Sequence, residues 1–183
     1  MKLRIPGIAG CIFLSAAGVL WGQDPAGPPA RVARLSSFNG SVAFRSAGVD
    51  EWSAAEVNRP LATGDRLWTD EESHADVHAG ATAVHLAPLT ALAILRLDDR
   101  VWQMSLSQGA INVRVPRMDE GEVFEIATPN GAIGLLQPGD YRIEVPATGE
   151  VTLVTVRSGD AEAAAGGQTF PVHAGQLLRL FGG

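Results

Sequence analysis

The sequence predicts an all-β protein with many short antiparallel strands, arranged as a sandwich, a roll or a short β-solenoid. Apolar and polar residues alternate with the two-residue period of half-buried strands in one segment after another. Turn-forming residues, mainly Gly, Asn, Asp and Pro, separate these segments at spacings of about 8–12 residues. No segment has a convincing helical pattern, and residues 161–165 are the one place where helix propensity competes.

Residues 58–97 contain the clearest alternation, and the rest of the chain is organised around them. Two alternating segments, residues 74–79 and 83–86, flank Gly80, which predicts a hairpin. One set of alternate side chains should face the core, namely Ala75, Val77, Ala79, Val84 and Leu86. The other set should face solvent, and it includes His74, Asp76, His78 and His85.

The remaining strands follow from the same pattern. Asn39-Gly40 predicts a tight turn, because both residues tolerate positive φ. Residues 47–58 form a polar excursion, in which Trp52 is expected to cover the edge of the core. Residues 101–107 alternate, and Gln108-Gly109 is expected to turn the chain before a further strand at 110–115. Later strands are expected near residues 124–126, 133–135, 141–145, 151–157, 170–172 and 178–180.

The first 22 residues are typical of an export signal. Lys2 and Arg4 precede an uncharged apolar run at residues 5–21. We therefore expect a signal peptide at 1–22, a Pro/Gly linker at 23–30 and a β domain at 31–181, in an exported protein of the periplasm or cell envelope. The alternatives are an uncleaved membrane anchor and lipid attachment at Cys11, within a sequence similar to a lipoprotein cleavage box. After cleavage the chain has no cysteine and therefore no disulfide.

Charge and residue spacing exclude several classes of function. The net charge of −6 argues against a nucleic-acid partner, because phosphate binding needs a basic face. His74 and His78 are four residues apart on a predicted strand, a step of about 13 Å that is too long for one zinc ion. Acidic pairs such as Asp98-Asp99 lie in predicted turns, where they solvate the chain. We therefore expect a non-enzymatic chain with no catalytic residue, metal ligand or cofactor.

Two tryptophans adjoin polar turns and define the candidate interaction surface. Trp102 alternates with other apolar residues and is expected in the core, whereas Trp52 and Trp68 are expected to be partly exposed. With the acidic turn beside Trp68, the candidate surface comprises Trp52, Trp68, Asp70, Glu71 and Glu72.

Several stretches together resemble the FecR domain family. They are residues 60–69 (PLATGDRLWT), 73–80 (SHADVHAG), 123–131 (VFEIATPNG), 139–145 (GDYRIEV) and 154–159 (VTVRSG). The resemblance covers about residues 31–180, and it lies in the order and spacing of these motifs. It implies an all-β periplasmic domain, which in the best-known members follows a cytoplasmic anti-sigma region and relays the state of an outer-membrane transporter. Because export begins at the first residues, we expect a stand-alone exported member without that region.

These observations lead to two functional expectations. The first is an interaction or sensing module of the bacterial cell envelope that acts in signal transduction, binding an envelope protein by exposed strand edges or by the polar loops near residues 52–72. The alternative is an envelope structural or carbohydrate-binding protein that holds glycan on its exposed Trp residues. Membrane attachment through the N-terminal segment is compatible with both.

Overall fold

The computed structural model describes residues 32–182. The predicted signal peptide, the linker and the cleavage box at Cys11 lie outside the described residues. Every regular element within the described range is a β-strand, which confirms the all-β prediction. None of the described residues forms a helix long and apolar enough to cross a membrane.

Sixteen strands follow one another along the described chain. They are β1 (Ala33–Asn39), β2 (Val42–Arg45), β3 (Ser53–Ala54), β4 (Pro60–Leu61), β5 (Arg66–Thr69), β6 (His74–Ala79), β7 (Thr82–Leu86), β8 (Ala91–Leu97), β9 (Val101–Val115), β10 (Val123–Thr128), β11 (Gly131–Leu135), β12 (Gly139–Val145), β13 (Val151–Ser158), β14 (Asp160–Ala165), β15 (Gln168–His173) and β16 (Leu177–Phe181). The segment at 161–165, where helix propensity competed, is strand β14.

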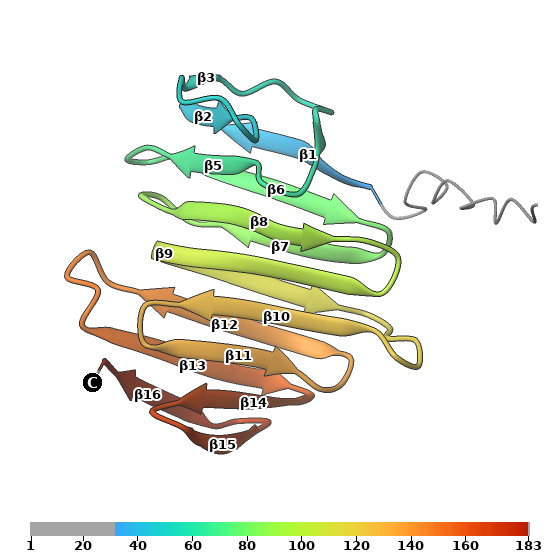
Figure 1. Cartoon of the computed structure of the whole chain (residues 1–183), viewed down its shortest axis with the longest axis vertical. Helices are drawn as coiled ribbons and strands as arrows, with labels where there is room; N and C mark the ends of the chain where they lie inside the picture. Colours follow the sequence, from blue (N-terminus) through green and yellow to red (C-terminus); the bar gives the residue numbers. More distant parts are fainter. Residues whose placement is uncertain (1–31, 183) are drawn as a thin grey trace, which may run out of the picture.

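The strands form two layers that face each other, and within each layer they are stacked one after another along the long axis of the molecule (Figure 1). Sheet A has the order β4-β1-β6-β7-β9-β12-β13-β16. Sheet B has the order β3-β2-β5-β8-β9-β10-β11-β14-β15. All of these pairs are antiparallel except β9–β10. The chain therefore advances from one end of the stack to the other, and β1 and β16 lie at opposite ends.

Strand β9 belongs to both sheets, which corrects the prediction of a turn at Gln108-Gly109. Its first part pairs with β8 and β10 in sheet B, and residues 109–115 pair with β12 in sheet A. Gly109 has φ +92° and bends the strand between the two layers. The inward side chains change from even positions, such as Leu106, to odd positions, such as Ile111, because the inner faces of the two sheets point in opposite directions.

The inner faces of the two sheets form one hydrophobic core. The predicted hairpin across Gly80 forms as β6–β7, with Ala79 opposite Thr82, and all five apolar residues predicted to face inward are buried. Trp102 is fully buried, as expected, and its ring packs against Phe124 with centroids 6.0 Å apart. Alternation of apolar residues therefore identifies the core faces correctly on both sides of the bend in β9.

Residues 46–61 cover the first end of the stack. Within this segment β3 extends sheet B beside β2, and β4 extends sheet A beside β1. Ala55 and Leu61 are buried, and the Arg59 guanidinium lies 3.8 Å from the centre of the Phe44 ring. Trp52 does not cover the core edge as predicted, because its side chain lies on the outer side and is 44% exposed. The buried Ala55 and Leu61 cover this end of the core instead.

Candidate functional site

The two predicted tryptophans lie on the outside of sheet B, near the covered end. Trp68 occupies an outward position of β5 opposite Ala43, is half-buried, and donates a hydrogen bond from Nε1 to Asp70 Oδ1 over 2.9 Å. Trp52 immediately precedes β3, and the Arg45 guanidinium lies 5.3 Å from its ring centre. Since β2 lies between β3 and β5, one strand separates the two aromatic positions.

Two arginines complete this surface. Arg45 of β2 and Arg66 of β5 are direct cross-strand partners on the outer face. Like charges placed opposite each other on a sheet are destabilising. Neither arginine forms an ion pair with a described residue. We call the set Arg45, Trp52, Arg66 and Trp68 the Trp–Arg surface.

The predicted acidic residues lie in the turn between β5 and β6, at one side of the Trp–Arg surface. Hydrogen bonds from the Trp68 indole and from Ser41 lower the pKa of Asp70 below its ordinary value, against a smaller opposing effect of burial. Glu71 and Glu72 are exposed, and Glu72 has φ +57°. The structure thus brings Asp70 to Trp68 and leaves the two glutamates at the solvent-exposed corner.

Arg45 and Arg66 belong to this surface but were not predicted from the sequence. Their signal in the sequence is weak, because each is one outward-facing charge on a short strand. Only the register of β2 against β5 shows that the two charges are adjacent. That register depends on the tertiary structure and on the turn residues between the strands.

A second polar group runs across the outer face of sheet A. Asp76 of β6 accepts a hydrogen bond from Ser37 Oγ over 2.6 Å and pairs with Nδ1 of His85 on β7. Further along the face, Arg142 of β12 is bound to Glu144 over 3.0 Å. We call Ser37, Asp76 and His85 the Asp76 cluster.

The Asp76 cluster does not have the arrangement of a nucleophilic triad. A nucleophilic serine must donate its proton to a histidine, whereas Ser37 donates to the carboxylate. Burial is the largest single influence on Asp76 and raises its pKa, but hydrogen bonds from Ser37 and His85, together with the charges of His85 and His78, lower the pKa below its ordinary value. No group of three or more His, Cys, Asp or Glu side chains within residues 32–182 has the arrangement of a metal site. The Asp76 cluster therefore forms hydrogen bonds that connect neighbouring strands of sheet A.

Comparison with known proteins shows a likeness in fold. No protein-family model and no curated protein matches the chain. Two crystal structures of a "putative anti-sigma factor" from Parabacteroides distasonis ATCC 8503 are similar, with TM-scores of 0.53 and sequence identities of 18% and 17%. In each case the match covers 64% of this chain and 59% of the other. The chain therefore has a fold that resembles part of that protein, which is consistent with a FecR-like domain.

Proposed function

We propose that this chain is a non-enzymatic, exported FecR-like domain that binds another protein of the bacterial cell envelope as an interaction or sensing module. The fold likeness to a protein described as a "putative anti-sigma factor" supports a place in signalling. The contact surface in this proposal is the Trp–Arg surface, with the acidic turn at its margin.

The proposal rests on the adjacent Arg45 and Arg66, neither of which forms an ion pair within residues 32–182. Their mutual repulsion costs stability in the isolated chain, and carboxylates of a partner would relieve it. Tryptophan and arginine are also the residues that contribute most to binding at protein interfaces. The partner in this proposal therefore presents acidic side chains to the two arginines and an apolar group to Trp52.

Photo-crosslinking in cells tests the proposal. A benzophenone amino acid at Trp52 should form a covalent adduct with one envelope protein, whereas the same group at the exposed Glu120, in the loop between β9 and β10, should not. The adduct should be lost in Arg66→Glu, since a carboxylate at 66 repels an acidic partner. Arg66→Glu also turns a repulsive cross-strand pair into an attractive one, which should stabilise the fold by up to about 1 kcal/mol. Loss of the adduct in a more stable variant therefore cannot come from unfolding.

Glycan binding is the second candidate, because Trp52 exposes 44% of its surface beside a cation. The same experiment separates the two candidates. Retention of the chain by peptidoglycan, lost in Trp52→Ala and unaffected by Arg66→Glu, with no protein adduct at position 52, would refute the protein-binding proposal.

A further inference from the structure

The stack has four sheet edges, and three of them are protected against pairing with another strand. At the covered end, β3 and β4 are each two residues long and Pro60 begins β4. At the other end, the N–H and C=O of His173 bind Gln176, so alternate residues of β15 direct their backbone groups away from β14. Pro171 is one of these residues and has no N–H to offer at that edge.

Strand β16 is the unprotected edge. It has five residues and no proline, and its pairing with β13 is its single pairing within the described sheets. Gly182 N–H donates to Glu150 O, and Gln176 O accepts from Val156, so the even-numbered residues face β13. The backbone groups of residues 177, 179 and 181 therefore point away from β13.

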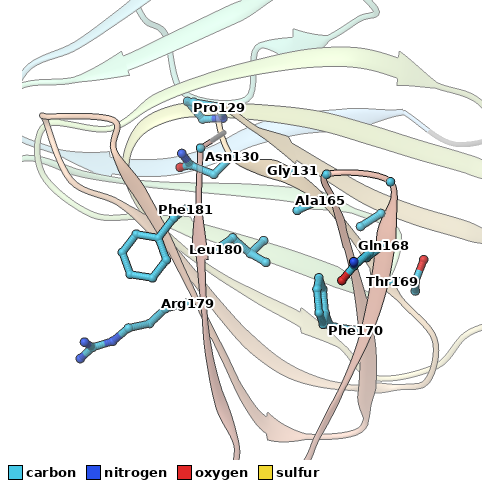
Figure 2. A pocket seen from close by; sticks show the side chains of 14 residues that line it. Pro129, Asn130, Gly131, Ala165, Gln168, Thr169, Phe170, Arg179, Leu180 and Phe181 are labelled. Carbon is cyan, nitrogen blue, oxygen red and sulfur yellow. The ribbon is translucent and has the colours of Figure 1, made fainter.

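A gap between β16 and the β14–β15 hairpin adjoins this edge. It measures about 970 Å³, and Figure 2 shows Leu180 and Phe170 pointing into it from the two sides. Arg179 and Phe181 point to the other side of β16, on the outer face of sheet A. Leu177 and Phe181 are 55% and 67% exposed, which is high for large apolar side chains. An added strand would cover apolar surface on both faces of β16.

Charge indicates what kind of strand would fit. Arg179 is the one charged residue of β16, its side chain lies on the outer face of sheet A, and it forms no ion pair with a described residue. A second copy of the chain is a poor fit, because the antiparallel register that places Leu177 opposite Phe181 also places Arg179 opposite its own copy. A strand with a carboxylate at that position has no such repulsion.

We propose that the free edge of β16 binds an extended segment of another protein as an added antiparallel strand. The segment has apolar side chains opposite Leu177 and Phe181, a carboxylate opposite Arg179, and further apolar side chains that enter the gap above Leu180. This site lies at the opposite end of the stack from the Trp–Arg surface and does not depend on the function proposed for that surface.

A peptide titration followed by amide NMR tests this proposal. The probe is the peptide Thr-Val-Leu-Glu-Leu-Val-Thr, and the matched control has Lys in place of Glu. The Glu peptide should shift the amide signals of β16 and bind about fivefold more tightly than the Lys peptide, because cross-strand charge pairs contribute on this scale. Arg179→Glu should reverse the preference. Leu177→Pro, which removes an N–H that faces away from β13, should weaken binding of the Glu peptide about tenfold.

Three results would overturn the proposal. One is the absence of shifts in β16 at millimolar peptide, and another is shifts confined to β2 and β5. The third is a β16 signal that depends on protein concentration without peptide, since a second copy would then occupy the edge. In each variant, unchanged signals from β6 and β7, far from the edge, show that the fold is intact.

Discussion

Tyr141 shows how one polar atom can connect the two layers. The side chain is fully buried on the inner face of β12. Its hydroxyl lies 2.6 Å from Gln137 O, in the loop after β11, and 3.1 Å from Asp160 O, at the start of β14. A residue of sheet A thus binds the backbone of two segments that adjoin sheet B. Burial raises the pKa of Tyr141 above its ordinary value, against the effect of these hydrogen bonds.

Replacing Tyr141 should therefore have two effects. Tyr141→Phe keeps the ring but removes the hydroxyl that donates to Gln137 O, and Asp160 O keeps only its bond from Leu136 N–H, so the change should cost about 1–2 kcal/mol of unfolding free energy at pH 7. A raised folded-state pKa means that this tyrosine contributes stability below about pH 10 and loses it as pH rises further. Wild type should then lose more stability than Tyr141→Phe between pH 9 and 11, as measured by urea unfolding.

Thr155→Val is the control for loss of a hydroxyl. Thr155 is half-buried and makes no side-chain hydrogen bond with a described residue, so its replacement should change the unfolding free energy by less than about 0.5 kcal/mol. Equal stability of Tyr141→Phe and wild type at both pH values would show that the hydroxyl does not connect the layers.

At the level of single residues, the sequence predicts burial well and surface geometry poorly. Trp102 was expected in the core and is there, because three alternating apolar positions define its face. Trp52 was expected to cover the core edge, but Ala55 and Leu61 do so. One aromatic residue in an irregular segment has no period from which its direction follows.

Among the elements, hairpins were the most predictable feature and β9 the least. The β6–β7 hairpin follows from alternation around one glycine, and the pairing of the two strands confirms it. In β9 the inward side chains change from even to odd positions. This change can indicate either a turn or a bend between sheets, and both agree with a glycine at position 109. Distinguishing them requires the partners β7, β8, β10 and β12, which are distant in sequence.

The Asp76 cluster connects three neighbouring strands, β1, β6 and β7, and should make their pairing sensitive to acid. Because the pKa of Asp76 is lowered in the folded chain, its contribution is present above about pH 4 and is lost as pH falls through the folded pKa. Asp76→Asn should therefore reduce the loss of stability between pH 5 and 3. The difference should stay below about 1 kcal/mol, because the pair is partly exposed to solvent.

Ser37→Ala gives an independent check of the Asp76 cluster. It removes one of the two hydrogen bonds that lower the pKa of Asp76, so it should produce part of the Asp76→Asn effect. Chemical unfolding at a series of pH values measures both. Parallel curves for wild type and the two variants would exclude a role for the cluster in acid stability.

For the whole molecule, the passage of β9 between layers should make the two sheets unfold together. A methyl group added at Gly109 would lie 2.5 Å from Thr90 Cα and 2.7 Å from Leu89 O, both backbone atoms. Thr90 is itself buried, and its hydroxyl accepts from Ala110 N–H over 3.1 Å. Gly109→Ala should thus displace the bend and cost about 3 kcal/mol or more, through a backbone clash in addition to positive φ.

Gly80→Ala is the matched control for Gly109→Ala. Gly80 also has positive φ, +60°, but an added methyl group there meets no atom within 4 Å. Gly80→Ala should lower the unfolding free energy by about 1–2 kcal/mol, because the left-handed conformation alone is unfavourable for alanine. Hydrogen exchange should show Gly109→Ala weakening protection in β7 and in β10 alike. Loss confined to one sheet would show that the layers unfold separately.

The difference between the two ends of the stack determines at which end further strands could be added. Additional strands placed after β16 would continue sheet A at its free edge without disturbing the hydrogen bonds described for that strand. The same addition before β1 would have to displace residues 46–61, together with the contact of Arg59 on Phe44. Elongated versions of this chain, whether evolved or engineered, should therefore gain length downstream and keep the upstream end unchanged.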